Sequence, residues 1–210
     1  MPIDHRTAVR ACAIAAIAGL AVPSLAASTF TNQAAFVSNL NPGYSLSTFN
    51  ALAAFSTPAT PMAVASGAFN VTATTAAQAF FIDTASGNNF LSTATATDGF
   101  SRPITLSFSG SPVNAVGGNF FVVSAFGQLV AEPVKLTFSD GFETTLSSPI
   151  NTTFFGYISD VPLTSLTVSP LATHRFVGID NLHVGGSPIP SPGAGVLALF
   201  AGVVASRRRR

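Results

Sequence analysis

The strongest constraint on the fold is a succession of short apolar stretches separated by turn residues. From Ala68 onward, groups of Gly, Asn, Asp, Ser and Pro recur about every ten residues, and no long helical pattern lies between them. This spacing is typical of an all-β chain in which short antiparallel strands form a β-sandwich. We expect roughly eight to ten strands in a jelly-roll-like arrangement over residues 27–185.

Alternation of apolar and polar residues marks the individual strands. Residues 103–110 alternate in this way, which predicts a half-buried strand, whereas residues 115–126 are apolar almost throughout, which predicts a strand covered on both faces. Residues 134–146 alternate on both sides of Asp140-Gly141, as in a β-hairpin. We therefore expect Phe108, Phe138 and Leu166 to lie in one core between two sheets.

The remaining segments are assigned by the same signals. Thr31 or Asn32 is a candidate cap for a short helix that carries Ala35, Phe36 and Leu40 on one face and ends at Asn41-Pro42-Gly43. Further strands are expected near residues 68–74, 79–83, 151–160, 163–170 and 175–185, and a turn is expected at residues 85–90.

Charge is scarce, and most of the positive charge lies at the two ends. Charged residues make up 8% of the chain, against about 25% in typical proteins, while hydrophobic residues make up 48%, which excludes a disordered chain. Between Arg10 and Arg207 only three cations stand against seven carboxylates, a net charge of −4. Nucleic-acid binding needs a basic surface, so we expect no nucleic-acid partner.

The first 26 residues have the organisation of a signal peptide. Arg6 and Arg10 precede an apolar segment over residues 11–22 that is too short to span a bilayer, and Pro23 then ends the helix. Small residues at Ser24 and Ala26 predict cleavage after Ala26, with Ala27 as the second choice. The alternative is a buried, alanine-rich helix. Cleavage would remove Cys12, the only cysteine, and with it any thiol-based metal site or disulfide.

The C-terminus has three parts. Residues 186–192 are expected to form a proline-rich linker and residues 193–206 an apolar helix, and Arg207, Arg208, Arg209 and Arg210 make up a basic end. A helix over 193–206 is roughly 21 Å long, against about 30 Å of bilayer hydrocarbon. The arginines are expected to remain on the cytoplasmic side. The alternative is a tail exposed to solvent, which would be prone to aggregation.

This arrangement resembles the PEP-CTERM sorting signal of Gram-negative bacteria. The matching residues are Pro190, Ser191, Pro192 and Gly193, followed by the apolar segment and the four arginines. Ser191 stands where the family typically has Glu. The resemblance implies export by the secretion machinery, transient anchoring in the inner membrane, processing by an exosortase and release to the cell surface or an exopolysaccharide matrix. Residues 34–40, 134–141, 152–168 and 176–185 also resemble the bodies that carry this signal.

Motifs for catalysis are absent from the sequence. It holds no Gly-x-Ser-x-Gly, no His-Glu-x-x-His and no phosphate-binding glycine loop. His174 and His183 are interpreted as loop and strand-surface histidines. Carboxylates for glycoside hydrolysis could come from Asp140, Glu143, Asp160 and Asp180, but no spacing selects a pair. No catalytic residue and no cofactor are assigned.

Asp180 is a candidate ligand for a structural calcium ion, because the jelly-roll modules that residues 178–184 resemble often carry such an Asp in the last strand. The alternative is a side chain that caps or braces a strand end. The chain has no Trp and only two Tyr, and we expect at least one residue of each of the pairs Phe80-Phe81, Phe120-Phe121 and Phe154-Phe155 to pack inside.

Two functions are compatible with these features. The first is an exported, non-enzymatic protein of the cell surface or matrix, whose sandwich contacts polysaccharide. The alternative is a secreted glycan-active hydrolase, which would require two facing carboxylates in a cleft.

Overall fold

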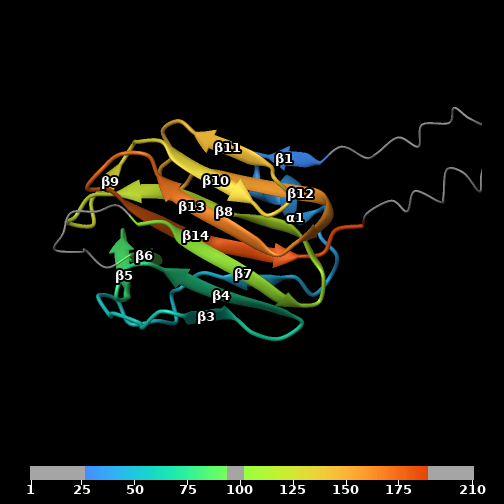
Figure 1. The fold of residues 1–210 in the computed structure, drawn as a ribbon, viewed down its shortest axis with the longest axis horizontal. Helices are drawn as coiled ribbons and strands as arrows, with labels where there is room; N and C mark the ends of the chain where they lie inside the picture. Colours follow the sequence, from blue (N-terminus) through green and yellow to red (C-terminus); the bar gives the residue numbers. More distant parts are fainter. Residues whose placement is uncertain (1–26, 94–101, 189–210) are drawn as a thin grey trace, which may run out of the picture. The chain divides into compact units, whose positions relative to one another are not determined.

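A computed structural model describes residues 27–93 and 102–188, which form an all-β fold with one short helix (Figure 1). The helix is α1 (Gln33–Val37). The strands are β1 (Ser28–Phe30), β2 (Ser45–Ser47), β3 (Met62–Ala65), β4 (Phe69–Thr75), β5 (Phe80–Ala85), β6 (Asn88–Thr93), β7 (Ile104–Gly110), β8 (Val113–Val123), β9 (Leu129–Val130), β10 (Val134–Phe138), β11 (Glu143–Leu146), β12 (Phe154–Leu163), β13 (Ser165–Pro170) and β14 (Phe176–Gly185).

The described residues hold fourteen strands, several of them only two to four residues long, rather than the eight to ten expected, and they form two antiparallel sheets. The larger, eight-stranded sheet has the order β1-β12-β8-β14-β6-β5, with β2 paired to β14 and β9 paired to β8. The six-stranded sheet has the order β11-β10-β13-β7-β4-β3. Buried residues from both sheets form one continuous hydrophobic cluster, so the sheets pack face to face as the turn spacing predicts.

The predicted core residues lie where alternation placed them. Phe138 is 2% exposed and Leu166 is fully buried, and their strands β10 and β13 pair at these two residues. Phe108 is partly buried and packs against the same cluster. In each of the three Phe pairs at least one ring is buried, which confirms that expectation. Alternation therefore identified the core face of these strands.

The eight-stranded sheet is covered on its outer face as well. All eleven residues of β8 are buried, in agreement with its continuous apolar sequence. On the outer face, Phe90, Phe121, Val123 and Phe176 form a second cluster, and Phe36, Ala115 and Phe154 form a third. Figure 1 shows β5, β6 and β9 at one end of the sandwich and α1 at the other.

Helix α1 is shorter than predicted. Asn32 caps it, because its Oδ1 accepts a hydrogen bond from the Ala35 amide at 2.9 Å. Phe36 is fully buried, but Ala35 is exposed and the helix ends at Val37 rather than at Asn41. The side chains of Ser38 and Asn39 both donate to the Ala35 carbonyl. Such contacts compete with further helical hydrogen bonds.

The turn at residues 85–90 is also shorter than the sequence predicts. The turn is confined to Ser86 and Gly87, which have positive φ angles of 54° and 78°, and β6 begins directly at Asn88. Asn88 and Asn89 adopt the strand because β5 lies alongside them from Asn88 to Thr93. Pairing with a neighbour thus overrides their turn preference.

No helix within the described ranges is long and apolar enough to cross a bilayer. The expected signal helix over residues 1–26 and the expected apolar helix over residues 193–206 lie outside those ranges.

Candidate functional site

Most of the predicted processing sites fall outside the described residues. This applies to Ala26, to the motif Pro190, Ser191, Pro192 and Gly193, and to Arg207, Arg208, Arg209 and Arg210. Ala27 is described: it is exposed and lies one residue before β1. These assignments therefore remain predictions from the sequence.

Asp180, the calcium candidate, is buried at a bulge of β14. Its Oδ1 accepts from the Asn181 amide at 2.7 Å, and its Oδ2 accepts from the side-chain amides of Asn88 and Asn181. Burial raises the pKa of Asp180 above its ordinary value, against these hydrogen bonds. Within the described residues, no group of three or more His, Cys, Asp or Glu side chains could hold a metal ion. The contacts are those of a carboxylate that braces a bulge.

His183 is not a surface residue, which corrects the interpretation from the sequence. It is 1% exposed because α1 and Tyr44 cover this part of the outer face, and the Tyr44 ring stacks on it at 5.7 Å. Its Nδ1–H donates to the Asn181 carbonyl at 2.7 Å, which leaves Nε2 to accept from the Gln33 side chain at 3.4 Å. Burial lowers the pKa of His183 and favours this neutral form. His174 is exposed in the loop before β14.

Asp140 and Glu143 also hold local structure. Asp140 Oδ1 accepts from the Phe142 amide at 3.0 Å, and Oδ2 accepts from the hydroxyls of Tyr157 and Ser159, both at 2.7 Å. Burial opposes ionisation, but these hydrogen bonds outweigh it and lower the pKa of Asp140. Glu143 pairs with Lys135 at 2.9 Å. Each carboxylate is thus occupied by its own hairpin and its neighbours.

The best candidate for a binding site is a pocket of about 250 Å³ on the outer face of the eight-stranded sheet. We call it the aromatic pocket. It is lined by Phe55, Phe81, Asp83, Ser92, Thr93, Val123, Ser124, Ala125, Phe126, Gly127 and Phe176. These residues come from four neighbouring strands, β8, β14, β6 and β5, from the loop after β8 and from the loop between β2 and β3. The sheet thus forms the floor and the loops form the rim.

Strand alternation explains the floor of the aromatic pocket. Phe80 and Ile82 belong to the core between the sheets, so Phe81 and Asp83 face outward. Phe81 pairs across the strands with Ser92, which brings both residues to the same side. This placement follows from the sequence of β5, but its neighbours could only be known from the pairing.

Exposed aromatic rings form the rim. The side chain of Phe126 is 89% exposed and that of Phe55 is 65% exposed. Phe55 is held in place, because its amide donates to the Ile82 carbonyl at 2.7 Å and its ring lies 6.3 Å from that of Phe81. The loop that carries Phe126 is closed by the Ser124 hydroxyl, which accepts from the amides of Phe126 and Gln128. Both rings are therefore presented by ordered backbone.

Asp83 is the one carboxylate among the described residues that line the aromatic pocket. It is only 6% exposed, and its Oδ1 accepts from the Thr84 amide at 2.8 Å. A Cβ atom placed on Gly127 would lie 2.1 Å from Asp83 Oδ2, so only glycine lets the loop approach the carboxylate this closely. Thr93 Oγ1 is also buried beside the pocket, and no described residue forms a hydrogen bond with it. Unsatisfied polar atoms are unusual in interiors and mark a place where a ligand could contribute.

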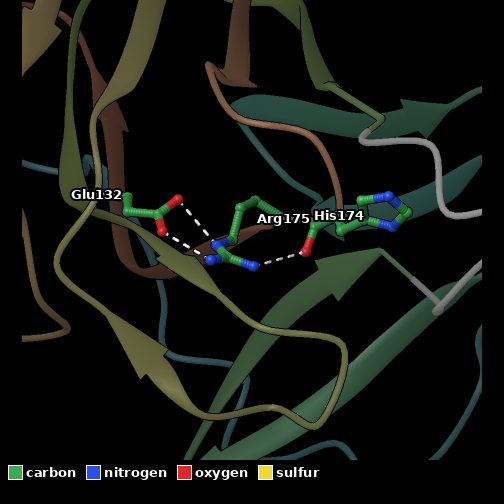
Figure 2. A network of polar contacts seen from close by, with 3 residues as sticks. All are labelled: Glu132, His174 and Arg175. Atoms are coloured by element: carbon green, nitrogen blue, oxygen red, sulfur yellow. Dashed lines mark hydrogen bonds and ion pairs between the residues drawn. The ribbon is translucent and has the colours of Figure 1, made fainter.

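An ion pair fixes the loop beside the aromatic pocket (Figure 2). Arg175 Nε and Nη2 donate to the two carboxylate oxygens of Glu132, both at 2.8 Å, and Nη1 donates to the His174 carbonyl at 3.2 Å. Two parallel hydrogen bonds of this kind fix direction as well as distance. The contact joins the loop after β9 to the start of β14, directly before the pocket residue Phe176.

Sequence reasoning missed the aromatic pocket as a whole. In the sequence Asp83 is one of seven carboxylates and belongs to no motif, and Phe55 and Phe126 lie in loops without any motif. Comparison of the chain with protein-family models, with curated proteins and with solved structures finds no match.

Proposed function

We propose that the protein is an exported, non-enzymatic protein of the cell surface or extracellular matrix that carries a PEP-CTERM-like sorting signal. The observation that carries this proposal is the combination of a signal peptide over residues 1–26 with a proline motif, an apolar segment and four arginines at the other end. Each part alone is common, but the order of the three C-terminal parts is specific.

The physical argument for transient anchoring has three steps. The apolar segment 193–206 is short for a bilayer, so it anchors the body weakly. Moving each arginine into the bilayer costs about 2.5–3.5 kcal/mol on insertion scales, so the basic end stops transfer. The prolines keep the preceding backbone extended and free of internal hydrogen bonds, which is a form that a protease can bind. Processing by an exosortase near Pro192 would then release the body.

The folded body is proposed to contact polysaccharide, with its strands in a jelly-roll-like arrangement. Of the four carboxylates considered for hydrolysis, Asp140, Glu143 and Asp180 bind backbone and side chains of their own neighbourhood, and Asp160 is exposed. The alternative, a secreted glycan-active hydrolase, requires two facing carboxylates. No cofactor is assigned, and calcium at Asp180 stays a prediction.

The sorting proposal is tested by changing the basic end. Replacing Arg207, Arg208, Arg209 and Arg210 by Ser should stop processing and misdirect the protein, because nothing would then hold the segment in its orientation. Replacement of the same four residues by Lys keeps the charge and is the matched control, which should be processed and located like the wild type. The readouts are the mass of the product and its distribution between membrane and medium. A Ser variant that behaves like the wild type would refute the sorting proposal.

The polysaccharide proposal has its own test. A binding array of polysaccharides, run beside an assay for released reducing sugar, separates the two functions. Binding without release supports a binding module. Release of sugar that follows the protein through purification would favour the hydrolase.

A further inference from the structure

The aromatic pocket contains a carboxylate that forms no ion pair with any described residue. Asp83 is 6% exposed, and the Thr84 amide is its only hydrogen-bond donor among the described residues. An ionised carboxylate offers about four acceptor positions. Burying it with so few donors is costly, so the pocket favours a ligand that brings positive charge or several donors.

The cations of the described residues are engaged elsewhere. Arg175 is held by both oxygens of Glu132, and Lys135 pairs with Glu143. Arg102 donates to the Ala76 carbonyl. None of the three forms an ion pair with Asp83, so the negative charge in the pocket is not neutralised by the described part of the chain. The net charge of −4 between Arg10 and Arg207 adds to the attraction of cations.

The rings of the aromatic pocket favour the same kind of ligand. The face of an aromatic ring carries partial negative charge and attracts ammonium groups that lie over it. Phe55 and Phe126 are exposed at the rim, and Phe81 and Phe176 line the floor. These rings also provide apolar surface for the carbon atoms of a ligand. A site of several rings around one carboxylate suits an organic cation better than a metal ion, which needs more oxygen ligands.

We propose that the aromatic pocket binds a compact organic ammonium, with the charged nitrogen at Asp83 and the carbon skeleton against the phenylalanine rings. The volume of about 250 Å³ lies below the range of about 300–1,000 Å³ for drug-sized ligands, so the ligand is a single ring or a short chain. An amino sugar and a small alkylamine share this chemistry. All lining residues of the aromatic pocket belong to the described body, so binding there does not depend on the sorting signal. An amino sugar as ligand would in addition name the class of polysaccharide.

The test is a titration of the purified full-length chain with each probe, in which binding is measured by calorimetry and by NMR of the ligand. The probes are glucosamine, propylammonium and glucose, which separate the amino sugar, the plain ammonium and the neutral ring. At least one of the two ammonium probes should bind, with an affinity at least about tenfold above that of glucose, since a charge-assisted hydrogen bond is lost in the neutral ligand. Equal binding of glucose and glucosamine would make this a site for neutral sugar and would overturn the proposal, as would no binding by either ammonium probe.

Variants locate the binding. Asp83→Asn keeps the shape of the side chain and should weaken the ammonium probe by at least about tenfold, whereas Asp160→Asn, at an exposed carboxylate outside the pocket, should leave it unchanged. Phe126 is 89% exposed, so Phe126→Ala should fold normally and allows binding in the pocket to be tested even if Asp83→Asn does not fold. Phe126→Ala should weaken binding severalfold, and Ile150→Ala, at an exposed residue that does not line the pocket, is its control. Unchanged binding in the folded pocket variants would overturn the proposal.

Discussion

Phe138 shows how much a single ring contributes to the core between the sheets. Its ring is 2% exposed, 4.6 Å from that of Tyr157 and 5.8 Å from that of Phe142. Replacing it by Ala removes a buried ring and leaves a cavity, so we expect a loss of about 3–5 kcal/mol in the free energy of unfolding. Urea unfolding followed by tyrosine fluorescence measures it.

The control for this substitution is Phe126→Ala, the same chemical change at a ring that is 89% exposed. Surface substitutions of this kind change stability by less than about 0.5 kcal/mol. A loss below about 1 kcal/mol for Phe138→Ala would mean that its face of β10 is not in the core.

His183 makes the stability depend on pH. Its pKa is lowered by burial from the ordinary value of 6.5, so the unfolded chain takes up a proton before the folded chain does. The contribution of neutral His183 to the free energy of unfolding is therefore fully present above pH 6.5. It is lost as the pH falls from 6.5 towards the lowered pKa of the folded state. The groups that face the ring are uncharged: Gln33 of α1, Tyr44, Phe36, Phe154 of β12 and the Asn181 carbonyl.

His183→Gln keeps a polar side chain but does not titrate. We expect the variant to lose the part of the pH dependence that the wild type shows just below pH 6.5. Thermal unfolding at a series of pH values measures the difference between the two proteins, in which the contribution of the buried Asp180 cancels. Parallel profiles for variant and wild type would contradict the assignment.

At the scale of the elements, two glycines of the eight-stranded sheet leave room for Phe36 of α1 to pack against it. A Cβ atom on Gly156 would lie 2.5 Å from the Phe36 ring, and one on Gly117 would lie 2.8 Å from it. The missing side chains create the space in which Phe36 is fully buried. Gly156→Ala should therefore displace α1 and cost about 1–3 kcal/mol, as overpacked substitutions do.

A double-mutant cycle checks this packing. Phe36→Ala alone should destabilise the protein, but in the presence of Phe36→Ala the cost of Gly156→Ala should fall, because the clash no longer exists. We expect a coupling energy of about 0.5–3 kcal/mol from unfolding curves of the four proteins. Additive costs would show that Gly156 does not serve this purpose.

Elements with a regular period were predictable, and those shaped by their neighbours were not. Alternation of apolar and polar residues predicts strands β7 and β10, and a continuous apolar sequence predicts β8. Strand β6 begins with Asn88-Asn89, whose local preference is for turns, and its pairing with β5 decides its structure. The short strands β1, β2 and β9 have two or three residues each, too few for any period to be recognised.

The candidate site could not be predicted from the sequence for a similar reason. Asp83 and Gly127 come together only because β5, β6, β14 and β8 are neighbours in one sheet, and that order is set by long-range pairing. The wrong interpretation of His183 has the same origin, since α1 lies far away in sequence. The continuous apolar sequence of β8 was the one available signal that the outer face is covered.

At the scale of the whole molecule, coverage of both faces of the larger sheet accounts for the low charge. The third hydrophobic cluster lies under α1, and the second lies on β6, β8 and β14 at the other end of the same sheet. The strands of the larger sheet are therefore buried on both faces. Such a sheet uses apolar residues on both faces and leaves few positions for charged ones. The aromatic pocket lies where this cover is incomplete, which is why a carboxylate and exposed rings occur together there.

The last prediction concerns the residue at which the mature protein begins. Cleavage after Ala26 or Ala27 would leave β1 intact, since β1 begins at Ser28 and pairs with β12 from Ser28↔Ile158 to Phe30↔Gly156. The small residues at Ser24 and Ala26 fit the site that signal peptidase requires. Mass spectrometry of the secreted protein should find Ala27 or Ser28 as its first residue. Ala26→Phe should block or shift the cut, while Thr31→Ser, outside the cleavage site, should not. Secreted protein that begins at Met1, or within β1, would contradict the assignment of residues 1–26 as a signal peptide.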